Sequence, residues 1–182
     1  RQISLEYETL IAHALETHTQ LMHDAGANDL VAGQGYLMLY RTERELLDFF
    51  KVADERAEAG VHHVKLTGAD VARAEPSLVG EFAGAVRWTD PLAISSPGDL
   101  VQAYARLFVQ RGGAVHLGDA TTLRRSDAGG WQVDTADGPT LEAAEVVVAL
   151  GPWTLELTAR YGYTAPMIPK RGYHMHYARL PD

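Results

Sequence analysis

The residues of this chain whose types and spacing could take part in chemistry gather around Gly151. A short, nearly unbroken apolar run from Glu145 to Leu150 leads into Gly151-Pro152-Trp153. Such a run is typical of a strand buried on both faces, as in a parallel sheet between helices. Because glycine has no side chain, a backbone or a ligand can come close to it after the strand. The pattern indicates a position where a ligand could lie against the backbone, and the alternative is a strand-to-helix turn that packs Trp153.

Two groups of histidines are candidate metal ligands by residue type. His174 and His176 alternate on a predicted strand and could hold a metal together, but a metal needs a third ligand and the sequence offers no convincing one. His13, His18 and His23 recur every five residues, a spacing that walks around a helix instead of stacking on one face. No metal site is therefore predicted.

Other catalytic motifs are missing from the sequence. The chain has no cysteine, which excludes disulfides, thiolate metal sites, cysteine nucleophiles and a flavin attached through a cysteine of this chain. Gly33 and Gly35 supply two glycines of a dinucleotide-binding fingerprint, but Met38 holds the third position and the segment enters a strand. There is also no P-loop, zinc spacing or nucleophile elbow. No catalytic residue is named.

The first half of the chain is predicted to alternate helices and strands. Thr42 with Glu45 three residues later forms a capping-box pattern. Tyr36, Met38 and Tyr40 share one face of their strand, where they either face a substrate cavity or pack in a core. The predicted elements are a helix over 3–25, strands over 35–40 and 61–66, a helix from 42 to about 60, and a brief helix from Thr67 or Asp70 to before Pro76.

The second half is predicted to contain a meander between two strands of a sheet. Trp131 to Thr135 alternates cleanly, and Asp137-Gly138 is a strong hairpin turn. Thr154 is expected to cap a helix that Gly162 stops. The predicted elements are a helix over 100–111, a strand over 114–117, a meander over 121–141, the apolar strand over 145–150, a helix over 155–161 and a strand over 167–177.

Composition narrows the class of protein. The 182 residues are 46% hydrophobic and 22% charged, which is close to an ordinary globular domain, and no apolar run approaches the length of a membrane helix. A net charge of −8 disfavours non-specific attraction to nucleic acid or to an anionic membrane surface. The chain opens with Arg1 rather than Met, which we interpret as a piece excised from a longer protein.

Several motifs together resemble the D-amino-acid oxidase/dehydrogenase superfamily of FAD-dependent oxidoreductases. They are AEVVVALGPWTLEL over 144–157, PMIPKRGY over 166–173, Glu75-Pro76-Ser77-Leu78, Gly84-Ala85-Val86 and Asp90-Pro91. Glu145 stands where the family usually has Asp, and Leu123 replaces a commoner Val. The resemblance covers roughly Gly35 to the C-terminus.

The resemblance implies an α+β fold. It combines a substrate domain, built on a mixed or antiparallel sheet, with the central part of a glutathione-reductase-like FAD-binding domain that is incomplete here. The expected division is 1–95 mainly substrate domain, 96–165 partial FAD domain and 166–182 a return to the substrate domain. Simple nicotinamide domains more often have a helix where this chain has its meander, which argues against an NAD-type piece.

For function, the resemblance implies a parent enzyme that uses FAD to oxidise an amino acid or other small amine by hydride transfer, giving an imine that hydrolyses to a keto acid. The implied cofactor contacts are Ala120 and Thr121, through the backbone to adenine, and Ala149, Gly151 and Trp153 beside the dinucleotide. Tyr36, Met38 and Tyr40 are the candidates for the substrate side.

For the isolated chain we expect no activity, no tightly held FAD, no nucleic-acid partner and self-association through exposed apolar edges. The parent is expected in the cytoplasm, with a peripheral position at the inner face of the cell membrane left open. The alternative to an enzyme is a non-enzymatic α+β binding or interaction module.

Overall fold

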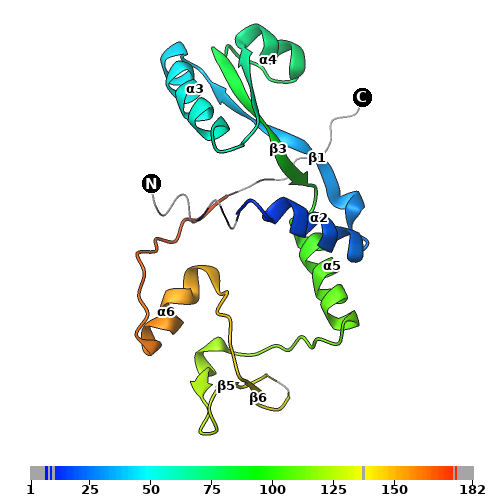
Figure 1. Ribbon diagram of the computed structural model, residues 1–182, viewed down its shortest axis with the longest axis vertical. Coiled ribbons are helices and arrows are strands. Elements are labelled where there is room, and N and C mark those ends of the chain that lie inside the picture. The colour runs from blue at the N-terminus through cyan, green and yellow to red at the C-terminus, as the bar shows by residue number, and fades with distance from the viewer. Residues whose placement is uncertain (1–6, 8, 10, 137, 174, 176–182) are drawn as a thin grey trace. The chain divides into compact units, whose positions relative to one another are not determined.

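The computed structural model describes residues 7, 9, 11–136, 138–173 and 175. The chain divides into two compact units, Arg1–Ala114 and Val115–Asp182. Both units combine helical segments with antiparallel strands, which agrees with the predicted α+β class (Figure 1).

The first unit is built on a three-stranded antiparallel sheet. Its strands are β1 (Val31–Tyr40), β2 (His63–Thr67) and β3 (Gly84–Ile94), in the order β1-β3-β2. The central strand pairs on both sides, with Val86 opposite Met38 of β1 and Lys65 of β2. Figure 1 shows α3 (Glu43–Ala57) on one side of the sheet and α4 (Gly68–Ala74) on the other.

Local sequence signals begin both of these helices. The Thr42 hydroxyl oxygen accepts a hydrogen bond from the backbone N–H of Glu45 at 3.3 Å, so Thr42 caps α3 as predicted. Thr67 and Asp70 form a complete capping box at α4, in which each side chain accepts from the other residue's backbone N–H. These caps satisfy N–H groups that the first helical turn leaves unpaired.

The core of the first unit lies between α3 and the sheet. Ala53 of α3 and Val86 of β3 are completely buried, and Trp88 is 2% exposed. Phe49 packs edge-on against Trp88, with ring centroids 6.3 Å apart. The face of α3 that carries Phe49 and Ala53 is therefore the face that covers the sheet.

Two further helices pack together in this unit. They are α2 (Ala14–Asp24) and α5 (Pro97–Gln110). The 3-10 turn η1 (Asn28–Leu30) lies between α2 and β1. The His18 ring nitrogen lies 3.0 Å from the Tyr104 hydroxyl, and Arg111 donates to Asp24 at 2.5 Å. Of the predicted helix over 3–25, residues 14–24 are confirmed, while 1–6, 8 and 10 lie outside the described residues.

The second unit contains the predicted meander. Its strands are β4 (Arg124–Arg125), β5 (Trp131–Val133) and β6 (Leu141–Ala143), antiparallel in the order β4-β5-β6. Around it lie the 3-10 helices η2 (Ala120–Thr122), η3 (Gly151–Trp153) and η4 (Ala159–Tyr161) and the short helix α6 (Thr154–Thr158). Gly162, at φ +81°, ends η4 as predicted. Asp137 of the expected hairpin turn lies outside the described residues.

Three predicted strands are wrong over their described residues. Residues 114–117, 145–150 and 167–173 form no strand, and Leu117, Val147 and Ile168 are 76%, 89% and 82% exposed. The apolar strand over 145–150 was expected in a parallel sheet. Both sheets of the described chain are antiparallel, and they include no residue of the three segments. Strand-forming side chains cannot make a strand without a partner for the backbone.

Two boundaries in the second unit also differ from expectation. The meander predicted over 121–141 has its first strand only at 124–125, because Asp119 caps η2 and residues 120–122 form a 3-10 helix. Thr154 does not cap a helix but is the first residue of α6, whose N-cap is Trp153 without a side-chain hydrogen bond.

Candidate functional site

The η2 turn, which contains Ala120 and Thr121, is formed by local hydrogen bonds. The Asp119 carboxylate accepts from the Thr121 backbone N–H at 2.8 Å, and the Thr122 hydroxyl donates to the Asp119 carbonyl at 2.7 Å. Hydrogen bonds from Thr121 lower the pKa of Asp119, and the positive charge of Arg160 adds to the effect. The carboxylate therefore stays ionised and keeps one backbone N–H of η2 occupied.

Two neighbouring residues of η4 reach across to this turn. The Arg160 guanidinium donates to the Thr121 carbonyl at 2.8 Å, and the Tyr161 hydroxyl donates to the Leu123 carbonyl at 2.5 Å. The Tyr161 ring meets Trp131 of β5 edge-on, with centroids 5.0 Å apart. We call Arg160 and Tyr161 the η4 clamp, because they join η2 to the meander.

The backbone of η2 keeps groups available for a ligand. Among the described residues, the Ala120 N–H has no acceptor, and the Thr121 carbonyl accepts only from Arg160 although a carbonyl oxygen has two lone pairs. Thr121 is exposed and Ala120 is half-buried. One edge of adenine presents an acceptor nitrogen beside an amino donor, so a backbone donor and acceptor close together fit it chemically.

Ala149, Gly151 and Trp153 lie at the other end of α6. Ala149 and Gly151 are exposed, and Trp153 is 68% exposed rather than packed. Gly151 has φ +56°, and a Cβ built on it would meet no atom of the described residues within 4 Å. The left-handed backbone explains the glycine, and the open space beside it leaves room for a ligand. Within the described residues, no hydrogen bond joins η3 to η2.

Tyr36, Met38 and Tyr40 lie on the face of the sheet that α3 covers. The Met38 sulfur accepts from the Trp88 indole N–H at 3.4 Å, and the Tyr40 ring lies 5.0 Å from that of Phe49. Burial raises the pKa of Tyr40. Tyr36 is 50% exposed. Packing thus accounts for Met38 and Tyr40, and a substrate role for any of the three stays a prediction.

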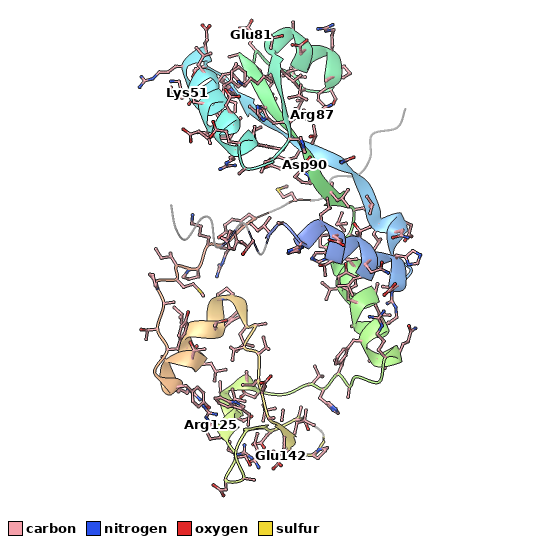
Figure 2. The ribbon with its side chains drawn as sticks, viewed as in Figure 1. Lys51, Glu81, Arg87, Asp90, Arg125 and Glu142 are labelled. Carbon is pink, nitrogen blue, oxygen red and sulfur yellow. The ribbon has the colours of Figure 1, made fainter. Side chains whose placement is uncertain are left out.

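Two further polar contacts lie outside these positions. In the first unit, Asp90 projects from β3 (Figure 2) and accepts from the His62 backbone N–H at 2.8 Å, with the His62 ring nitrogen 3.0 Å away. These hydrogen bonds lower the pKa of Asp90. In the second unit, Arg125, also labelled in Figure 2, lies over the Trp131 ring at 3.9 Å.

Neither a metal nor a membrane site emerges from the described residues. Within them, no group of three or more His, Cys, Asp or Glu side chains could hold a metal ion. The His174–His176 pair lies outside the described residues. None of the helices that the structure describes is long and apolar enough to cross a membrane.

Sequence reasoning missed the η4 clamp. Arg160 and Tyr161 are 39 and 38 residues away from their acceptors, and nothing in a helix-ending Arg-Tyr-Gly pattern indicates which carbonyls they reach. The alternating Trp131 was predicted on a strand, but its contact with Tyr161 was not. Only the folded chain brings these residues together.

Comparison with known proteins identifies relatives along almost the whole chain. The family described as FAD dependent oxidoreductase matches residues 2–182. A glycine oxidase of Geobacillus kaustophilus is 29% identical over 154 residues, which cover 84% of this chain and 40% of that protein. D-amino acid dehydrogenases of Vibrio vulnificus and Methylobacterium radiotolerans are 26% and 31% identical, covering 90% and 93% of this chain and 40% of each relative.

Solved structures give the same picture. The crystal structure of the Geobacillus kaustophilus glycine oxidase matches with a TM-score of 0.68 at 27% identity, over 90% of this chain and 43% of that one. A glycine oxidase structure from Bacillus cereus has the same TM-score at 20% identity, over 88% and 43% of the two chains, and shows likeness of fold alone. The chain spans about two fifths of the length of the curated relatives it matches.

Proposed function

Because the chain belongs to the family of FAD-dependent oxidoreductases, we propose that it is the central part of an enzyme that oxidises an amino acid or other small amine. The family match over residues 2–182 is the observation that carries the proposal. FAD, when bound, supplies the acceptor for the hydride of the amine's α-carbon, and the imine product is hydrolysed to a keto acid.

The two units have different tasks in this proposal. The antiparallel sheet of the first unit, β1-β3-β2, belongs to the substrate domain, and the meander of the second unit belongs to the FAD domain. The proposed domain boundaries remain 1–95, 96–165 and 166–182. The helix α5 packs with α2 inside the first unit, so its assignment to the FAD domain is the least supported part of this division.

The proposed cofactor contacts follow from the open backbone groups. Ala120 and Thr121 would bind adenine through the unpaired N–H and the second lone pair of the carbonyl. Ala149, Gly151 and Trp153 would lie along the dinucleotide, supported by the open space beside Gly151. Of the three substrate-side candidates, Tyr36 is best supported because half of its side chain is exposed.

The proposed substrates are amino acids, with glycine and D-amino acids first because the matched relatives carry those names. A cytoplasmic location, or a peripheral one at the inner face of the membrane, stays a prediction. For the isolated chain we propose self-association, supported by Val147 and Leu117, which are 89% and 76% exposed. A concentration-independent monomer in sedimentation experiments would contradict it.

The test of the enzymatic proposal uses the complete gene product. Its visible spectrum is recorded, and glycine, D-amino acids and N-methyl amino acids are then added one by one without oxygen. A flavin spectrum that bleaches with one of them supports the proposal and identifies the substrate. A colourless protein that leaves added FAD unbound refutes it and favours a non-enzymatic binding module.

The isolated chain gives a separate test. Its expected failure to hold FAD tightly follows from the missing pyrophosphate-binding fingerprint. Purified chain 1–182 that retains one flavin per molecule would overturn this expectation without affecting the proposal for the complete protein.

A further inference from the structure

The η4 clamp donates hydrogen bonds to two points of one short turn. Arg160 donates to Thr121, inside η2, and Tyr161 donates to Leu123, directly after it. Both hydrogen bonds end on backbone carbonyls, so they constrain the path of the chain rather than the side chains. The clamp itself is anchored, because Tyr161 packs on Trp131 and the neighbouring Leu157 is 5% exposed.

A turn of this kind needs such support. A three-residue 3-10 helix contains too few hydrogen bonds to hold a single conformation on its own. The Asp119 carboxylate fixes its start by accepting from the Thr121 N–H, and this leaves the Ala120 N–H as the open donor. Arg160 takes one lone pair of the Thr121 carbonyl and leaves the other.

From this arrangement we propose that Arg160 and Tyr161 are positioning residues for the adenine end of FAD. They hold η2 so that the Ala120 N–H and the Thr121 carbonyl meet adenine together. The inference rests on the proposed function, since it takes FAD as the ligand. The clamp preorganises the turn, and preorganisation improves affinity by reducing the entropy lost on binding.

The experiment uses the complete protein freed of FAD and compares paired variants. Tyr161→Phe removes the hydroxyl but keeps the ring on Trp131, and Arg160→Gln removes the charge while Arg160→Lys keeps a cationic donor. The matched controls are Tyr163→Phe, two residues further along and 61% exposed, and Arg106→Gln, exposed on α5. Dissociation constants are measured for FAD and for ADP, which carries only the adenine end.

Tyr161→Phe and Arg160→Gln should each weaken FAD binding by a factor typical of one lost hydrogen bond, about three- to tenfold. ADP binding should weaken by the same factor, because the clamp acts at the adenine end. Arg160→Lys should restore most of the affinity that Arg160→Gln loses, and the two controls should bind like the original protein.

The outcomes separate this inference from the proposed function. Clamp variants that bind FAD and ADP like the controls overturn the inference but leave the flavoenzyme proposal intact. Weaker FAD binding with unchanged ADP binding also overturns it, since the effect then lies away from adenine. If the clamp variants lower the melting temperature equally with and without FAD, Arg160 and Tyr161 have a structural role only, and the inference is overturned. An original protein that binds no FAD sinks the proposed function itself.

Discussion

Gly151 offers a direct way to find the cofactor, because a methyl group added there would meet no other part of the chain that the structure describes. Its φ is +56°, and a Cβ at this position has none of those atoms within 4 Å. Gly162 has the same two properties, with φ +81° and open space around it, but it lies at the far end of the helical segment. Gly151→Ala and Gly162→Ala therefore form a matched pair.

The expected magnitudes differ between stability and binding. A non-glycine residue in the left-handed region costs about 1–2 kcal/mol, so both variants should lose that much folding stability. If FAD lies against the backbone at residue 151, the new methyl group occupies part of its place. We then expect FAD to bind at least about tenfold more weakly to Gly151→Ala, a loss of about 1.4 kcal/mol, and normally to Gly162→Ala.

The assay is a titration of the complete, FAD-free protein, together with urea unfolding of each variant. Unfolding in the absence of FAD measures the backbone strain that the two variants share. The titration measures the loss of FAD affinity, which only Gly151→Ala should show. Equal FAD affinities for the two variants would refute the placement of the dinucleotide beside Gly151 and leave the glycine as a turn residue.

Three other predictions concern folding. Trp88→Ala should destabilise the first unit by about 3–5 kcal/mol because it empties the centre of the core, and a loss below about 1 kcal/mol in urea unfolding would contradict that view. Thr67→Ala should cost about 1 kcal/mol by removing the cap of α4, and an unchanged unfolding midpoint would show that the cap contributes nothing. Hydrogen bonds from Arg124 and then Thr140 lower the pKa of Asp134 in the folded protein. Ionised Asp134 therefore stabilises the fold at pH values above its pKa in the unfolded chain, about 3.9, and this stabilisation is lost as the pH falls through the folded pKa. Asp134→Asn should therefore lose less stability than the original protein on acidification below about pH 4, and parallel pH–stability curves would disprove the link.

Most signals that act within a few residues were read correctly from the sequence, with Thr154, which caps no helix, as an exception. Thr42 and Thr67 begin helices, Gly162 ends one, and the alternation at Trp131 marks a strand of the meander. In each case the hydrogen bond or backbone angle involves residues that are neighbours along the chain. The family was also recognised from short motifs, and the match over residues 2–182 confirms it.

Signals that depend on a partner strand were misread. The run Val146-Val147-Val148 has the composition of a buried strand, but Val147 is 89% exposed and the run is unpaired in the described chain. The residue types of a segment show that it can form a buried strand, but they do not show whether a neighbouring strand is present to pair with it. The same reason applies to residues 114–117, where apolar side chains find no sheet.

The same distinction, between local signals and contacts with distant residues, applies to the candidate site. The sequence by itself determined the family and the antiparallel meander, because these depend on residue types at fixed spacing, whereas the left-handed backbone at Gly151 was found only in the structure. Only the tertiary structure placed Arg160 and Tyr161 on the carbonyls of Thr121 and Leu123, and Met38 against Trp88. Carbonyl groups are alike at every residue, so the sequence carries no mark of which ones a distant donor will reach.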